Sequence, residues 1–347
     1  MHIADKTRER TIRIVLLFLS ILVPSCIGGL RDLSVGKDVL LYGTEFFQYA
    51  KSCDSIRELF ENMDSTEYGY FLLNYLCARF CNNIHFFLWF SEFFKLSLMI
   101  ATVWFFRKKV SSSIIIFSYM IFFWILGLSM LRQSLALSLC IYSLTFYYNK
   151  KFTSFILIVL TAYFFHNSAF AMLFLPIADL IFYIFKKRAI FIIGGITGIA
   201  YMMAIPMFIY IVEIGLVRAD AIDMYLDSGV NTPKTNILIL LFIFISTFFT
   251  KRNKIERYTY TILTQAIFCL CFILMSTFFE VAFRMSYYQS IVLFIIYPFV
   301  IQNSSNRKSV SIYNAIYILV LFFHYITAVK HGLDGCIPYK SEILGIT

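Results

Sequence analysis

The side chains best suited to chemistry in this chain are ionisable residues that interrupt or border long apolar runs. Arg132 is followed by Gln133 inside residues 126–136, and apolar runs lie on both sides of this stretch. A charge near membrane hydrocarbon costs roughly 2.5 kcal/mol or more, so such a residue usually faces a partner or a wet cavity. Helical spacing predicts a small, polar stripe facing neighbouring helices, formed by Ser129, Arg132, Gln133, Ala136, Cys140 and Ser143. The alternative is that Arg132 extends from a helix end to the lipid headgroups.

Other ionisable residues stand where further apolar runs end, namely Arg31, His166, Glu280 and Arg284. The arginines of this set, together with Arg132, favour a phosphate or diphosphate ligand. A guanidinium fork pairs with phosphoryl oxygens in a bidentate manner, which a lysine cannot do. The alternative for each residue taken singly is an anchor in the headgroup layer.

A general base is the second requirement of group-transfer chemistry, and the chain offers three candidates. His166 precedes Asn167 and Ser168 at the end of an apolar run, and a histidine in water titrates near pH ~6.5. Glu67 and Asp38 are the competing bases, and the sequence alone does not choose among the three. A histidine hydrogen-bonded between helices is the structural alternative for His166. The sequence predicts no metal site, because one histidine at each position is too few for zinc ligation.

The composition is that of a polytopic membrane protein. Of the 347 residues, 60% are hydrophobic and 14% are charged, whereas about a quarter of the residues in soluble domains are charged. The net charge of +10 is divided among short clusters between apolar runs. That pattern is typical of topology signals and argues against a nucleic-acid-binding face. The eight cysteines include no CxxC pair.

The basic clusters predict how the chain crosses the membrane. A basic N-terminus before the first apolar run indicates a cytoplasmic N-terminus, and the later clusters all fall on the same side if the chain crosses about eleven times. The expected spans cover about residues 14–30, 84–106, 112–127, 130–148, 152–166, 168–185, 189–215, 235–250, 257–279, 285–302 and 310–328. We therefore expect an all-α, polytopic membrane fold with a single domain over residues 1–347. This topology places Arg31, Arg132, His166 and Arg284 on the outer face.

Two polar segments are expected outside the membrane, over residues 31–83 and 216–234. Residues 31–67 hold eight acidic and four basic side chains, a balance that fits the outer face. The apolar run at 68–79 has only about a dozen residues, which is too short to span. We expect it to form a re-entrant or interfacial helix.

Several short motifs, taken in their order and separation, resemble the EpsG family of Wzy-type bacterial polysaccharide polymerases. The matching stretches are Gly29-Leu30-Arg31-Asp32 with Gly36-Lys37-Asp38 and Tyr42, Glu67-Tyr68-Gly69-Tyr70 with Leu72-Leu73-Asn74, Arg132-Gln133-Ser134-Leu135-Ala136, Phe165-His166-Asn167-Ser168-Ala169, and Arg284 with Tyr287-Tyr288. Tyr68 and Ser129 depart from the proline and asparagine that are common in the family.

The resemblance implies a Wzy-like, GT-C-like membrane glycosyltransferase without a cofactor. It would join oligosaccharide repeat units carried on a polyprenyl diphosphate, at the outer face of the bacterial cytoplasmic membrane. Its partners would be the lipid-linked oligosaccharide, membrane lipid, and flippase and chain-length regulator proteins. The residues expected to bind the diphosphate or the sugar are Arg31, Asp32, Lys37, Tyr42, Arg132, Gln133, Arg284 and Tyr288; the catalytic candidates are His166, Glu67 and Asp38.

Proteins of other classes could also use a cationic cavity in the membrane. A flippase for lipid-linked oligosaccharides would be expected to have two similar halves and charges at the membrane midplane, and this sequence has no internal repeat. A surface-polysaccharide ligase or an O-acetyltransferase is the other alternative.

Overall fold

The computed structural model describes residues 9–61, 66–213, 234–248, 256–277, 280–304 and 307–346. All regular elements in these residues are helices, and the expected all-α fold is confirmed to that extent. The predicted outer loop at 216–234 lies outside the described residues except for its last residue.

Several helices are long and apolar enough to cross a membrane, so the protein is a multi-pass membrane protein. The six candidate spans are Arg10–Gly29, Ile84–Phe106, Asn167–Ala204, Arg257–Met275, Val281–Asn303 and Ser309–Lys330. Three shorter apolar helices cover Ser112–Trp124, Phe152–Tyr163 and Thr235–Thr247. The expected count of eleven spans is not confirmed. One reason is that the three shorter helices fall below the length expected of a span. The runs at 168–185 and 189–215 are separated, as expected, at the short turn η4 (Lys186–Arg188), where Lys186 has φ +51°.

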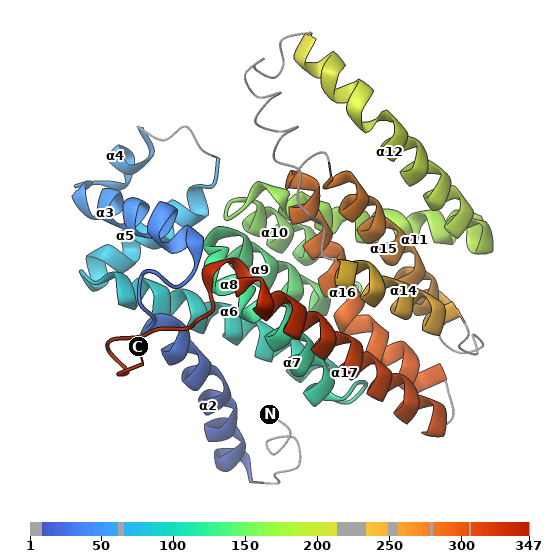
Figure 1. Ribbon diagram of the computed structural model, residues 1–347, viewed down its shortest axis with the longest axis horizontal. Helices are drawn as coiled ribbons and strands as arrows, with labels where there is room; N and C mark the ends of the chain where they lie inside the picture. Colours follow the sequence, from blue (N-terminus) through green and yellow to red (C-terminus); the bar gives the residue numbers. More distant parts are fainter. Residues whose placement is uncertain are drawn as a thin grey trace. The chain divides into compact units, whose positions relative to one another are not determined.

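The chain forms two compact units. The first contains residues 1–170 and 325–347, and the second contains residues 171–324. The long helices of the first unit are α2 (Arg10–Gly29), α6 (Ile84–Phe106), α9 (Leu131–Tyr148) and α10 (Phe152–Tyr163). Helix α9 packs against α6 and α10, and α6 packs against α2 (Figure 1). The prediction of one membrane domain over residues 1–347 stays a prediction.

Helix α9 is buried on nearly all sides, and this revises the expectation of a single polar stripe. Of the predicted stripe, Gln133, Ala136, Cys140 and Ser143 are buried in α9, but so are Leu135, Leu139 and Leu144 on the other faces of the helix. Arg132 and Tyr142 are among the few side chains of α9 that keep partial exposure. Helix α9 is therefore the centre of the first unit, and its polar side chains must find partners within the protein.

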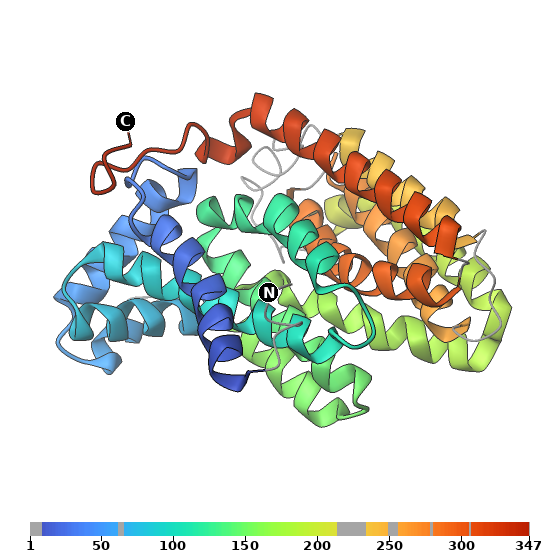
Figure 2. The ribbon, with the colours of Figure 1, turned by 90° about the horizontal axis from the view of Figure 1, so that it is seen from below.

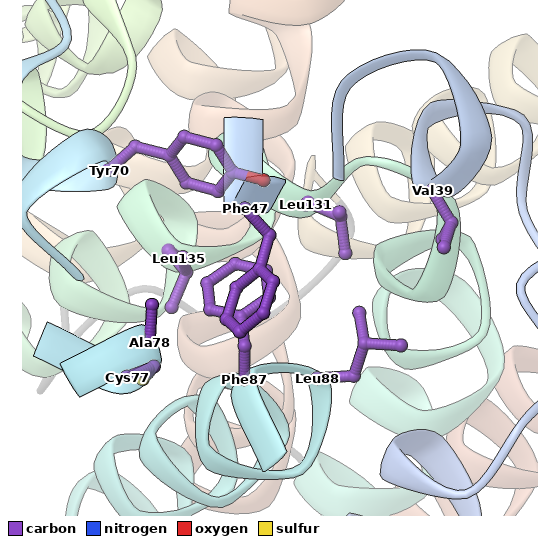
Figure 3. Close-up of a cluster of buried hydrophobic side chains, with 9 residues drawn as sticks. All are labelled: Val39, Phe47, Tyr70, Cys77, Ala78, Phe87, Leu88, Leu131 and Leu135. Atoms are coloured by element: carbon purple, nitrogen blue, oxygen red, sulfur yellow. The ribbon is translucent and has the colours of Figure 1, made fainter. Parts of the chain in front are cut away.

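The short apolar run expected to lie at the membrane interface is helix α5 (Tyr68–Phe80), which has 13 residues. It packs against α3 (Thr44–Ser52) and α4 (Ile56–Glu61), as Figure 1 shows. Its apolar residues share a core with α3, α6 and the start of α9. Figure 3 shows Phe47 and Phe87 meeting at the centre of this core, with Tyr70, Leu131 and Leu135 around them. The core ties α5 to the first turns of α9.

The second unit is organised around α15 (Glu256–Met275). This helix packs against α11 (Phe174–Phe185), α12 (Ala189–Glu213), α14 (Lys234–Phe248) and α16 (Glu280–Ser304). The boundary between the two units falls within helix α17 (Arg307–Lys330). The C-terminal segment follows this helix (Figure 2).

Candidate functional site

Arg132 lies in the first turn of α9, directly after a break in the helical chain. Helix α7 (Ser112–Tyr119), the π-helical turn η2 (Met120–Trp124) and α8 (Leu126–Ser129) form the preceding run. Met130 has φ −74° and ψ 71°, which is not helical, and α9 begins at Leu131. The break matches the turn expected between the runs at 112–127 and 130–148. It gives α9 an N-terminal end, whose first backbone N–H groups have no acceptor within the helix, and Arg132 is the second residue of this helix.

Glu67, the residue before α5, is the ion-pair partner of Arg132. Arg132 Nη1 donates to Glu67 Oε2 at 2.6 Å, and the two side chains are 21% and 7% exposed. The start of α5 is also tied to the end of α10, because the backbone N–H of Gly69 donates to the carbonyl of Phe164 at 2.8 Å. These two contacts bring the start of α5 to the start of α9 and to the end of α10, which lie much later in the sequence.

His166 lies between α10 and the 3-10 helix η3 (Asn167–Leu173), and its ring faces the same carboxylate. Its Nε2 is 3.9 Å from Glu67 Oε1. On the other side of the ring, Nδ1 is 2.6 Å from Ser168 Oγ and accepts from the backbone N–H of Ser168 at 3.3 Å. A backbone N–H can only donate, so Nδ1 is an acceptor and the neutral ring carries its hydrogen on Nε2. His166 therefore presents a donor to Glu67.

Aromatic side chains cover the other side of Arg132. The guanidinium carbon lies 4.7 Å from the ring centre of Tyr42 and 5.8 Å from that of Phe46, and these two rings are stacked. A guanidinium over an aromatic face is attracted by the electrons of the ring, so this contact fixes the plane of the Arg132 side chain. Nearby, burial raises the pKa of Tyr70, so its hydroxyl stays protonated at neutral pH.

Arg31 does not join this cluster. It is fully buried and donates to the backbone carbonyls of Gly28 and, at 2.8 Å, of Leu128. Its charge faces Glu92 of α6 at 3.8 Å. A side chain at Gly28 would collide with Glu92, so the glycine allows α2 to approach α6 closely. Burial lowers the pKa of Arg31, and the Glu92 carboxylate opposes that shift.

Glu92 and Lys95 are charged residues that the sequence reasoning missed. Lys95 Nζ donates to Glu92 Oε1 at 2.6 Å, to the Gly127 carbonyl at 3.0 Å and to Ser134 Oγ at 3.1 Å. Both side chains are buried within the apolar helix α6. Opposite charges three residues apart inside a span were the available signal, since ionisable residues within a membrane segment call for a partner. The network joins α2, α6, α8 and α9.

This network predicts an order of stability among variants. Glu92→Gln should destabilise the protein strongly, by about 3–5 kcal/mol, because two buried cations lose their shared carboxylate. Lys95→Met should cost less, because Glu92 keeps Arg31 as its partner. Thermal unfolding of the purified proteins in detergent measures both. A Lys95→Met protein less stable than Glu92→Gln would contradict this assignment.

The remaining residues predicted to bind substrate are dispersed. Asp32 and Lys37 contact the C-terminal segment: Asp32 Oδ1 accepts from the Glu342 backbone N–H at 2.8 Å, and Lys37 Nζ lies 3.1 Å from Asp334 Oδ1. Asp38 is partly buried and precedes the π-helical turn η1 (Val39–Gly43), and Gln133 is buried in α9. Arg284 and Tyr288 lie one turn apart on α16 of the second unit. The side chain of Glu280 lies outside the described part of the chain.

No group of three or more His, Cys, Asp and Glu side chains that could hold a metal ion occurs among the described residues.

These features define a helical, multi-pass membrane protein with a buried acidic side chain between an arginine and a histidine. The family model of the EpsG family matches residues 14–341, nearly the whole chain, and the protein belongs to this family of Wzy-type, polymerase-like membrane proteins. No curated protein and no solved structure matches the chain.

Proposed function

We propose that this protein is a glycosyltransferase that polymerises oligosaccharide repeat units carried on a polyprenyl diphosphate. The family supports a polysaccharide polymerase-like role in the membrane. The observation that carries the finer proposal is the position of Glu67, whose two carboxylate oxygens face Arg132 and His166 respectively. A cation for the leaving group and a base for the acceptor are the two groups that this transfer needs.

Arg132 is assigned to the diphosphate of the donor. Its guanidinium has five N–H donors in a fixed fork, and the contact to Glu67 is made through Nη1. Nη2 and Nε can therefore bind phosphoryl oxygens, assisted by the N-terminal end of α9, where the helix dipole favours an anion. As the glycosidic bond to the diphosphate breaks, negative charge grows on the leaving oxygen, and a positioned cation lowers the barrier. Arg284 of α16 is the alternative arginine for this role.

Glu67 is assigned as the base that takes the proton of the acceptor hydroxyl. The 3.9 Å between Glu67 Oε1 and His166 Nε2 is too long for a hydrogen bond. A hydroxyl oxygen can nevertheless lie about 2.8 Å from both atoms at once, donating to the carboxylate and accepting from the imidazole. Diphosphate binding at Arg132 would weaken the hold of the guanidinium on Glu67 and leave the carboxylate to accept the proton. His166 then orients the acceptor, and Asp38 is the competing base.

The active site is assigned to the outer face of the bacterial cytoplasmic membrane, with the N-terminus in the cytoplasm. This assignment rests on the alternation of basic clusters along the chain. The donor, its acceptor, a flippase and a chain-length regulator are the proposed partners. The energy for transfer is stored in the diphosphate linkage, so no nucleotide is required.

A deletion strain tests this function and separates it from that of a flippase. Loss of a polymerase should leave single repeat units at the cell surface, and the wild-type gene should restore the polymer. Loss of a flippase should leave lipid-linked units on the cytoplasmic side. Polymer of normal length on the deletion strain would contradict the proposal. Polymer that is retained on the lipid carrier would indicate a ligase.

A further inference from the structure

The segment after α17 is bound along its length to the loop that follows α2. Figures 1 and 2 both place this C-terminal segment beside that loop. The backbone N–H of Gly36 donates to the Gly335 carbonyl at 2.9 Å, and that of Asp32 donates to the Lys340 carbonyl at 3.0 Å. Ser341 Oγ donates to the carbonyl of Leu30. We call residues 331–346 the C-terminal clamp.

Asp334 is the clamp residue that reaches the helix break before Arg132. Its Oδ2 accepts from Ser129 Oγ at 2.8 Å, and its Oδ1 lies 3.1 Å from Lys37 Nζ. Ser129 is the last residue of α8, so the carboxylate joins the clamp, the loop after α2 and the end of α8. Ser129 lies three residues before Arg132 in the sequence.

The packing around Asp334 leaves little freedom at this junction. Leu333 and Cys336 of the clamp are buried against Leu128. Gly36 has φ +94°, and a side chain there would lie 2.9 Å from the Ser129 Cα atom. The loop therefore touches the backbone of α8 directly, with the clamp closing over both.

The backbone of the clamp is itself strained at this point. Gly332 and Gly335 have positive φ, and so do the intervening residues Leu333 (φ +43°) and Asp334 (φ +56°). A non-glycine residue with positive φ is unfavourable and persists only where its surroundings impose it. Such strain accumulates at functional sites more often than in simple connecting turns.

We propose that the C-terminal clamp positions Arg132, and that Asp334 is a positioning residue acting through Ser129 and the break at Met130. This inference rests on the proposed function for its effect on turnover. Met130 interrupts the helix between α8 and α9, and the contacts of Lys95 with Gly127 and Ser134 hold the two helices together from the side of α6. The clamp holds the end of α8 through Ser129, and the ion pair of Arg132 with Glu67 depends on the resulting direction of α9.

Three measurements on the purified full-length protein test the clamp, and two of them need no activity. Burial raises the pKa of Cys336 to about 12, and the thiolate is the reactive form, so maleimide should modify Cys336 very slowly. In Asp334→Ala the modification of Cys336, located by mass spectrometry, should be at least about tenfold faster. Hydrogen exchange of the peptide covering residues 128–134 should accelerate in the same variant.

The third measurement is turnover with a lipid-linked repeat unit. Asp334→Ala should lose roughly 10–10²-fold in kcat with KM nearly unchanged, because a misplacement of about 1 Å can cost that much. Asp334→Asn keeps an oxygen that accepts from Ser129 and should recover most of the rate. If Asp334 acts through Arg132, the losses of Asp334→Ala and Arg132→Lys should not add in the double variant. Glu61→Gln, which removes a carboxylate from the exposed Arg57–Glu61 ion pair, is the matched control and should behave as wild type.

The possible failures are distinguishable. If the wild-type protein makes no polymer, the proposed function is wrong. The labelling and exchange measurements then still test whether the clamp constrains the end of α8. If hydrogen exchange at residues 128–134 is unchanged in Asp334→Ala, the proposed role of the clamp is wrong, whether or not Cys336 becomes reactive. Wild-type turnover in an active Asp334→Ala protein, or simple additivity with Arg132→Lys, also overturns it.

Discussion

Replacing Glu67 by glutamine is expected to lower turnover by roughly 10²-fold or more while donor binding stays near normal. The substitution keeps the size and an oxygen that can accept from Arg132, but the amide cannot take a proton at neutral pH. His166→Gln should lose less, because the imidazole presents a hydrogen on Nε2 and orients the acceptor rather than accepting its proton. The measurement is in vitro polymerisation with purified lipid-linked repeat unit, comparing these two variants with Asp38→Asn.

Glu61→Gln serves again as the control. It removes a carboxylate from the same polar segment, and the Glu61 side chain is exposed. Each variant must also retain the unfolding temperature of the wild type, because Glu67 is part of an ion pair. A Glu67→Gln enzyme with wild-type turnover would exclude Glu67 as the base. In that case the losses in His166→Gln and Asp38→Asn decide between the remaining candidates.

The features that the sequence predicted correctly are those that local composition determines. The run at 68–79 is a short helix because its length and apolar content specify one, and α5 covers Tyr68–Phe80. The turn near residue 130 was expected because polar residues interrupt two apolar runs, and Met130 is the break. Membrane character follows from composition in the same direct way.

The relationships among candidate residues could not be read from the sequence, because they are long-range contacts. Glu67 and Arg132 are 65 positions apart, and Ser129 and Asp334 are 205 positions apart. Arg31 is buried against Glu92 while Arg132 contacts Glu67, and the expectation that three arginines lie at one level of the membrane stays a prediction. The carboxylate that each arginine contacts is determined by the folded chain. A single sequence does not show which residues pair.

The count of spans was the least predictable feature of the fold. Hydropathy marks apolar runs, but it does not say whether a helix stops at a basic cluster or continues through it. At Lys186, Lys187 and Arg188 the helix stops as expected: α11 ends at Phe185, Lys186 has φ +51°, and α12 begins at Ala189. Helix α9 was harder to assign, because Arg132, Gln133 and its serines make it polar for a span, yet its neighbours bury it.

Arg132→Lys is expected to abolish most polymer while the protein remains at its normal level in the membrane. The lysine keeps the charge, but it lacks the planar fork that binds two phosphoryl oxygens and stacks on Tyr42. Removing one donor that stabilises developing charge typically lowers kcat by about 10²–10³-fold, and we expect a loss of this size in vitro. Inhibition by added polyprenyl diphosphate should weaken in parallel, because the same guanidinium would bind that product.

The matched control is Arg57→Lys, at an exposed arginine of the polar segment 31–67 that also pairs with a carboxylate. An arginine that only anchors its helix to headgroups would be replaced by lysine without loss, because both side chains can extend to the membrane surface. Full polymer in Arg132→Lys, and again in Arg132→Ala, would therefore reduce Arg132 to an anchor. Full polymer in Arg132→Lys with loss in Arg132→Ala would show that the function needs the positive charge at this position. It would exclude a requirement for the bidentate fork of the guanidinium. Loss in both, with Arg57→Lys active, is the result that a diphosphate ligand at this position requires.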